Sequence, residues 1–255
     1  MTKARALVTN DDGITSPGLA ALAGMSVANG LSTVVAAPAH ESSGTSAGLT
    51  ATGHRRIAVA PQELAGLPNV PSCAVAGHPG LIVLVAAQGA FGSIPDIVLS
   101  GINRGANVGR AVLHSGTVGA VLTASVNDLH GLAVSLDVGL DHTGPEHWAS
   151  AAGAVEQAVA LLHDSPAGTV FNVNVPNVEP DRLPPLRQAP LARFGTVRSR
   201  VRRLHDDTLE LVDVEGTAEP EPDSDAALLA AGHPTITPLR PVGEDPDYLL
   251  PLRAR

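Results

Sequence analysis

Aromatic residues and cysteine are both scarce in this chain. Aromatic residues make up only 2% of the 255 residues, whereas hydrophobic residues make up 44%, so Ala, Val and Leu have to build the core. Such a core needs many small contacts, and we expect burial between subunits to add to it. The single cysteine, Cys73, excludes an intramolecular disulfide, and the absence of a CxxC motif or a Cys/His cluster argues against zinc.

Positive charge is also in short supply. Lys and Arg together number 16 against 25 Asp and Glu, which gives a formal net charge of −9. This charge argues against a general polyanion-binding surface, and the few aromatic rings offer little for stacking on single-stranded nucleic acid. No nucleic-acid polymer is expected as a partner. A small anionic substrate would need its charge met locally, by a metal, by backbone amides or by a few arginines.

Long apolar runs are absent. The longest clear run, residues 81–87, is too short to span a membrane. The N-terminus runs directly into the first predicted strand, which leaves no room for a signal peptide. We therefore expect a cytoplasmic protein with no membrane partner.

The most informative stretch is residues 4–18, which read A-R-A-L-V-T-N-D-D-G-I-T-S-P-G. Its apolar start predicts a buried parallel strand, and Ser16-Pro17 predicts the start of a helix. Asp11 and Asp12 then lie at the carboxyl edge of the sheet, where open α/β folds bind ligands. Adjacent carboxylates repel each other and favour a bound cation such as Mg²⁺, Mn²⁺ or Ca²⁺, although a solvated turn that caps the helix is an alternative.

Strands and helices alternate along the chain as far as residue 176. Polar, glycine-containing loops at 39–46 and 101–109 follow two of the strands and resemble phosphate- or metal-facing loops, although tight turns would also explain them. Residues 114–117 open a helix whose free N–H groups would suit a phosphate. Residues 50–71 are compatible with edge strands or with a lobe above the sheet. The pattern predicts strands at 33–37, 96–100, 132–136 and 169–175, and helices at 17–28, 81–88, 114–129 and 145–163.

The pattern changes after residue 176. Residues 197–214 alternate around Asp206-Asp207 like a hairpin, an acidic stretch follows at 215–225, and residues 233–239 predict another strand. The arginines between 182 and 203 are most simply a solvated strand face, with contact to substrate as the alternative. We interpret 177–255 as an extension that wraps the core or reaches a partner subunit.

Several motifs occur in a specific order: V-T-N-D-D-G, A-P-x-x-x-S-S-G, S-G-I-N-R-G-A-N-V-G and H-S-G-T-V-G-A. Together with F-N-V-N-V-P at 171–176 and T-I-T-P-L at 235–239, they resemble the SurE (survival protein E) family. That family comprises metal-dependent phosphatases of nucleoside 5′- and 3′-monophosphates. The resemblance covers residues 7–239. It implies an α/β fold in which a Rossmann-like three-layer core with a mostly parallel sheet (1–176) carries a C-terminal β-hairpin and extension (177–255), used for dimer or tetramer assembly within a single functional domain.

The resemblance also implies roles for individual residues. Asp11 and Asp12 are the expected catalytic pair, and either could orient the attacking water. One divalent cation per subunit would be held by Asp11, Asp12, Ser43 and Asn103, where Gly44 sets the register in favour of Ser43 over Ser42. The expected phosphate- and substrate-binding residues are Asn10, Gly44, Thr45, Asn107, Ser115, Gly116 and Thr117.

The second loop departs from the family pattern. Ala39, His40, Glu41 and Ser42 stand where the family usually has an Asp and one or two Arg, so that a bidentate phosphate donor is lost. We expect a metal-dependent 5′/3′-nucleotidase. A phosphatase for a pathway-specific phosphorylated metabolite and a non-catalytic nucleotide-binding protein are the alternatives. A dinucleotide-dependent dehydrogenase is excluded, because the first turn lacks G-x-G-x-x-G and carries carboxylates instead.

Overall fold

A mostly parallel sheet forms the centre of the computed structural model, which describes residues 3–50, 56–139, 142–193, 197–203, 208–215 and 219–244. The strand order is β3-β4-β2-β1-β5-β6-β7-β11-β8. Neighbours from β4 to β7 are parallel, whereas β3 runs antiparallel to β4 and β11 antiparallel to β7. The strands are β1 (Arg5–Thr9), β2 (Ser32–Pro38), β3 (Val59–Pro61), β4 (Ser72–Val75), β5 (Ile97–Arg104), β6 (His130–Asp137), β7 (Val170–Pro176), β8 (Arg187–Gln188) and β11 (Thr235–Leu239).

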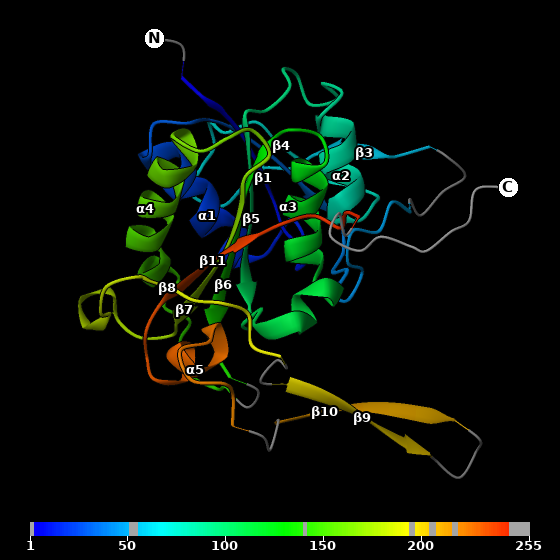
Figure 1. Ribbon diagram of the computed structural model, residues 1–255. Coiled ribbons are helices and arrows are strands. Elements are labelled where there is room, and N and C mark those ends of the chain that lie inside the picture. The colour runs from blue at the N-terminus through cyan, green and yellow to red at the C-terminus, as the bar shows by residue number, and fades with distance from the viewer. Residues whose placement is uncertain are drawn as a thin grey trace, which may run out of the picture.

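Helices cover both faces of this sheet. In Figure 1, α1 (Pro17–Ala28) and α4 (Ala152–His163) lie on one side, and α2 (Pro79–Ala86) and α3 (Gly116–Ser125) lie on the other. Short 3₁₀ helices η1 (Gly109–His114), η2 (Trp148–Ala151) and η3 (Pro180–Arg182) connect these elements. This arrangement confirms the predicted three-layer α/β architecture.

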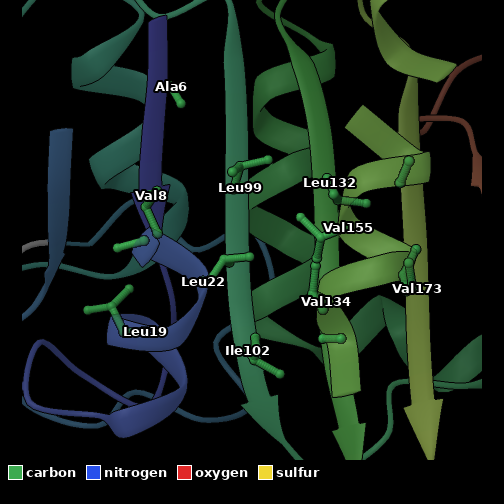
Figure 2. Close-up of a cluster of buried hydrophobic side chains, with 14 of the residues drawn as sticks. Ala6, Val8, Leu19, Leu22, Leu99, Ile102, Leu132, Val134, Val155 and Val173 are labelled. Atoms are coloured by element: carbon green, nitrogen blue, oxygen red, sulfur yellow. The ribbon is translucent and has the colours of Figure 1, made fainter. Parts of the chain in front are cut away.

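The side chains of each inner strand alternate between two apolar cores, as the pleat of a strand requires. Figure 2 shows one core, in which Leu19 and Leu22 of α1 and Val155 of α4 pack with Val8 and Leu99 of the sheet. The second core lies under α2 and α3 and takes the alternate strand positions, including Leu7, Val98 and Ala133. Strands that are buried on both faces have continuous apolar runs in the sequence, and this pattern made them predictable.

Most predicted elements agree with the structure to within a few residues. One strand and one helix have different ends from those predicted, and the structure gives the reason for each. The strand predicted to end at Ser100 continues to Arg104, because the register between β5 and β6 shifts between Ser100 and Asn103. This bulge adds one residue to β5 and restores pairing at Asn103 and Arg104. The helix predicted from residue 145 begins at Ala152, since the 3₁₀ turn η2 comes first. Residues 50–71 contribute the edge strand β3, which was one of the two alternatives.

The sheet continues beyond residue 176. Strand β11 pairs with β7, and β8 pairs with β11, so the C-terminal segment extends the core sheet. The predicted hairpin is present as β9 (Val197–Arg203) and β10 (Leu209–Glu215), which project from the body in Figure 1. Its predicted turn at Asp206-Asp207 and residues 216–218 of the acidic stretch lie outside the described residues.

The helix α5 (Asp225–Ala230) ties the C-terminal segment to the loop that follows β5. Both Asp225 carboxylate oxygens accept backbone hydrogen bonds, Oδ2 from the N–H of Gly109 at 2.8 Å and Oδ1 from that of Ala192 at 2.8 Å. Among the described residues, no helix is both long and apolar enough to cross a membrane.

Candidate functional site

A pocket of about 400 Å³ opens where β1 and β5 end and α3 begins. All four of the ordered motif segments meet there, because parallel strands bring their carboxyl ends to one edge of the sheet. Three carboxylates and one guanidinium contribute to its wall. The lining residues are Asp11, Asp12, Glu41, Ser43, Gly44, Asn103, Arg104, Asn107 and Ser115.

Asp11 is buried, with 4% of its surface exposed, and α3 supports it from behind. The Thr117 hydroxyl donates a hydrogen bond to Asp11 Oδ1. Burial raises the pKa of Asp11, while the Thr117 hydroxyl and the backbone N–H groups of Thr117 and Gly116 act to lower it. A Cβ at Gly116 would lie 2.7 Å from Asp11 Oδ2, so only glycine lets the carboxylate approach the helix this closely. The positive end of α3 therefore faces Asp11.

Asp12 has a buried oxygen, Oδ2, with no hydrogen-bond partner among the described residues. Burial first, and then the charge of Asp11, raise the pKa of Asp12 to about 6. Glu41 adds to this rise, whereas the backbone N–H and the charge of Arg104 oppose it. A buried carboxylate oxygen without a partner is costly unless a cation or another donor reaches it.

The oxygen atoms around Asp11 and Asp12 are suitable ligands for a hard divalent cation. No group of three or more His, Cys, Asp or Glu with metal-binding geometry occurs within the described ranges, so neutral oxygens would have to complete a shell started by the aspartates. Asn103 offers Oδ1, which lies 3.3 Å from Thr117 Oγ1, while its Nδ2 donates to Gly105 O at 2.8 Å. Ser43 offers its hydroxyl, which donates to Glu41 Oε1 at 2.9 Å. Carboxylate, amide and hydroxyl oxygens are the ligands that Mg²⁺ and Ca²⁺ prefer.

Asn107 is held on the pocket wall by side chains of β6 and β7. Its Nδ2 donates to Ser135 Oγ at 2.9 Å, and its backbone N–H donates to Asn174 Oδ1 at 2.8 Å. Its carbonyl oxygen accepts from Nδ2 of Asn172 at 2.8 Å and of Asn174 at 2.9 Å. Ser135, Asn172 and Asn174 are fully buried, and their hydrogen bonds to the half-buried Asn107 fix the loop after β5 relative to the sheet.

Four of the residues expected to bind phosphate or substrate do not line the pocket. Asn10 is fully buried and closes the first turn, since its Nδ2 donates to Gly13 O at 3.0 Å. The Thr45 hydroxyl donates to Ser42 O at 2.9 Å within the second loop. Gly116 and Thr117 lie against Asp11, since a Cβ at Gly116 would meet Asp11 Oδ2 and the Thr117 hydroxyl donates to Asp11 Oδ1. Their direct contact with a phosphate stays a prediction.

Sequence reasoning missed two kinds of contributor. Glu41 and Arg104 line the pocket, although the sequence pattern marks Glu41 only as a departure from the family and Arg104 only as part of a motif. Asn172 and Asn174 hold Asn107 from β7. Their signal was visible in F-N-V-N-V-P, because polar residues at alternate positions of an otherwise apolar strand need partners.

Comparison with known proteins places the chain in a family. The family model described as Survival protein SurE matches residues 6–199. A protein named 5′-nucleotidase SurE from Symbiobacterium thermophilum is 35% identical over 238 residues, covering 91% of each chain. One of the same name from Moorella thermoacetica is 35% identical and covers 91% of this chain and 88% of its own.

The fold comparison agrees with the sequence comparison. The crystal structure of the SurE protein from Aquifex aeolicus has a TM-score of 0.70 and 24% identity, covering 92% of this chain and 93% of that chain. The two chains therefore share a fold along nearly their whole length. With the family-model match and the relatives above, this chain belongs to the survival protein SurE family.

Proposed function

We propose that this chain is a divalent-metal-dependent phosphomonoesterase that hydrolyses nucleoside 5′-monophosphates, and also 3′-monophosphates, to nucleoside and phosphate. One observation carries the proposal: adjacent carboxylates, Asp11 and Asp12, lie in a polar pocket and leave Asp12 Oδ2 buried without a partner among the described residues. The relatives named above carry the name 5′-nucleotidase. They favour neither a pathway-specific phosphatase nor a non-catalytic binding protein.

Asp11, Asp12, Ser43 and Asn103 would hold one cation, with Mg²⁺, Mn²⁺ and Ca²⁺ as the proposed candidates. When bound, such a cation withdraws charge from the phosphoryl oxygens and makes a water molecule more acidic. The rest of the chemistry belongs to side chains of the pocket. Asp11 or Asp12 accepts a hydrogen bond from the attacking water and directs it at phosphorus. Asn107 and Ser115, on the same wall, donate hydrogen bonds to the phosphate oxygens.

The protein contributes mainly position and charge. Phosphoryl transfer needs little covalent chemistry from an enzyme, so that rigid donors placed before the reaction are the main requirement. Here the rigidity comes from buried supports: Thr117 for Asp11, and Asn174 for Asn107. Ser115 is itself fixed, since its Oγ accepts from the backbone N–H of Val118 at 3.1 Å.

The same proposal includes a cytoplasmic location and a homodimer or homotetramer assembled through residues 177–255. The projecting hairpin β9–β10 supports assembly, because an isolated two-stranded hairpin is only marginally stable in water. Light scattering on the intact chain and on a variant that lacks residues 194–218 would test this, and an unchanged number of subunits in the variant would contradict it.

The activity is tested by phosphate release from nucleoside 5′- and 3′-monophosphates and from simple phosphomonoesters, with Mg²⁺ or Mn²⁺ and with chelator. Asp12→Asn is assayed beside Asp181→Asn, which changes an exposed aspartate away from the pocket. We expect metal-dependent turnover of nucleotides that is lost in Asp12→Asn and kept in Asp181→Asn. Turnover of simple esters alone would instead indicate another phosphatase, and nucleotide binding without turnover would indicate a binding protein.

A further inference from the structure

Arg104 is the one cationic side chain among the residues that line the pocket, and the function proposed above does not use it. It is the last residue of β5, directly after Asn103 and beyond the bulge that sets the register of both. Asp11, Asp12 and Glu41 together exceed its charge by two. A single divalent cation leaves the pocket formally neutral only because the Arg104 charge is counted, and without Arg104 a phosphate dianion would enter a site with net negative charge.

One hydrogen bond orients the Arg104 guanidinium, and its other N–H groups remain available to a ligand. Its Nε donates to Glu146 Oε1 at 2.9 Å, and no other hydrogen bond of the guanidinium occurs among the described residues. The side chain of Arg104 is 48% exposed and that of Glu146 is 30% exposed, so the pair is open to solvent, and Arg104 lines the pocket. Holding Nε leaves the two terminal nitrogens as a fork, which is the arrangement that binds an oxyanion through two parallel hydrogen bonds.

Glu146 is positioned by neighbours on both sides. The backbone N–H of His147 donates to Asn177 Oδ1 at 2.8 Å, and Asn177 Nδ2 donates to Pro145 O at 3.3 Å. Asn177 directly follows β7, so this loop is anchored to the sheet. Arg104 also holds the pKa of the Glu146 carboxyl below its usual range, which keeps the acceptor ionised.

We propose that Arg104 binds the phosphate group of the substrate through its two terminal nitrogens and that Glu146 is the positioning residue that aims it. The inference rests on the proposed phosphatase function. It also gives a physical reason for the second loop: a phosphate-binding arginine supplied from the end of β5 makes an arginine in that loop unnecessary. Glu41 occupies the loop instead and hydrogen bonds Ser43.

The test compares Arg104→Met, Arg104→Lys and a control, Arg182→Met, which removes an exposed arginine of η3. Steady-state kinetics with a nucleoside monophosphate gives KM and kcat, and calorimetry gives the affinity for inorganic phosphate in the presence of Mn²⁺. We expect Arg104→Met to raise both KM and the phosphate Kd roughly 10- to 100-fold, as for the loss of hydrogen bonds between charged groups. Arg104→Lys should recover only part of this, and Arg182→Met should match the wild type.

The positioning role of Glu146 predicts a separate effect on KM and kcat. Glu146→Ala should raise KM several-fold with kcat unchanged, and Glu146→Gln, which keeps an oxygen for Arg104 Nε, should restore it; Glu156→Ala on the exposed face of α4 is the control. A wild-type phosphate Kd and KM in Arg104→Met would overturn the inference while the wild-type enzyme remained active. No turnover by the wild type with any metal would instead contradict the proposed function, and the phosphate Kd of Arg104→Met would still decide the role of Arg104.

Discussion

The Thr117 hydroxyl donates a hydrogen bond to Asp11 Oδ1, although the two residues are 106 positions apart in the chain. This contact joins the end of β1 to the first turn of α3. It gives the buried Asp11 carboxylate one fixed hydrogen-bond donor, while Asp11 and Asp12 both still line the pocket. The stability and the proposed activity therefore depend on the same contact.

Thr117→Val removes this donor at nearly constant volume. The buried Asp11 carboxylate then lacks a hydrogen bond, and we expect the free energy of unfolding to fall by about 1–3 kcal/mol. The apparent affinity for Mn²⁺ should fall with it, since Asp11 is no longer held in place. Urea unfolding and calorimetry measure the two quantities, with Thr117→Ser as the variant that keeps the hydroxyl. Wild-type metal affinity in Thr117→Val would contradict a positioning role.

Gly116→Ala tests the close approach of Asp11 to α3. The new methyl group would lie 2.7 Å from Asp11 Oδ2 and 2.8 Å from its Cβ, so the carboxylate has to move. We expect a loss of about 1–3 kcal/mol in stability and a large loss of phosphate release. Gly153→Ala on α4 is the matched control, because a Cβ there meets nothing within 4 Å. That control should gain about 0.5–1 kcal/mol, and equal behaviour of the two variants would refute the steric argument.

Asn174→Leu tests the support of Asn107. It removes the acceptor of the Asn107 N–H and one of the two donors to the Asn107 carbonyl, at a fully buried position. We expect a destabilisation of about 2–4 kcal/mol and a raised KM, because the loop after β5 loses its anchor. Asn69→Leu, at an exposed position, should change neither quantity. Denaturant midpoints and initial rates measured on the same preparations decide the matter.

Asp225 makes stability depend on pH. Burial raises the pKa of its carboxyl above 3.8, and the N–H groups of Ala192, Gly109 and Ala226 only partly oppose this. Because the folded value is the higher one, the folded chain binds the proton more tightly. The resulting stabilisation is complete below 3.8 and is lost as the pH rises through the folded value.

The check is to subtract the free energy of unfolding of Asp225→Asn, which cannot ionise, from that of the wild type across this range. The difference should fall steadily with rising pH and level off above the folded pKa. A difference that rose with pH would mean that the three N–H donors outweigh burial.

Much of the architecture was predictable because its signals are local. The helix predicted at 17–28 matches α1, since Ser16-Pro17 marks its start unambiguously. The inner strands were predictable because burial on both faces demands continuous apolar runs. The short strands β4 and β8 were missed, as two to four residues give no period to detect.

The location of the candidate site was also predictable from local signals, whereas the contacts of its individual residues were not. Adjacent carboxylates after a strand, followed by a helix that starts at Ser16-Pro17, indicated where a cation and a phosphate would bind, and the pocket lies there. Sequence reasoning could not tell which polar residues face the pocket. Gly116 and Thr117 turned out to support Asp11, and Arg104 reached Glu146 across 42 positions of the chain.

The sequence by itself determined the order of the longer strands and helices, the edge of the sheet that carries the polar loops, and the pair of aspartates there. These follow from side-chain period, capping and turn chemistry, which act over a few residues. Only the tertiary structure decided the bulge in β5, the pairing of β11 with β7, and the contact of Asp225 with Gly109 across 116 positions. Such contacts depend on register and on packing between distant segments, and a change of one residue in register reverses which side chains face the site.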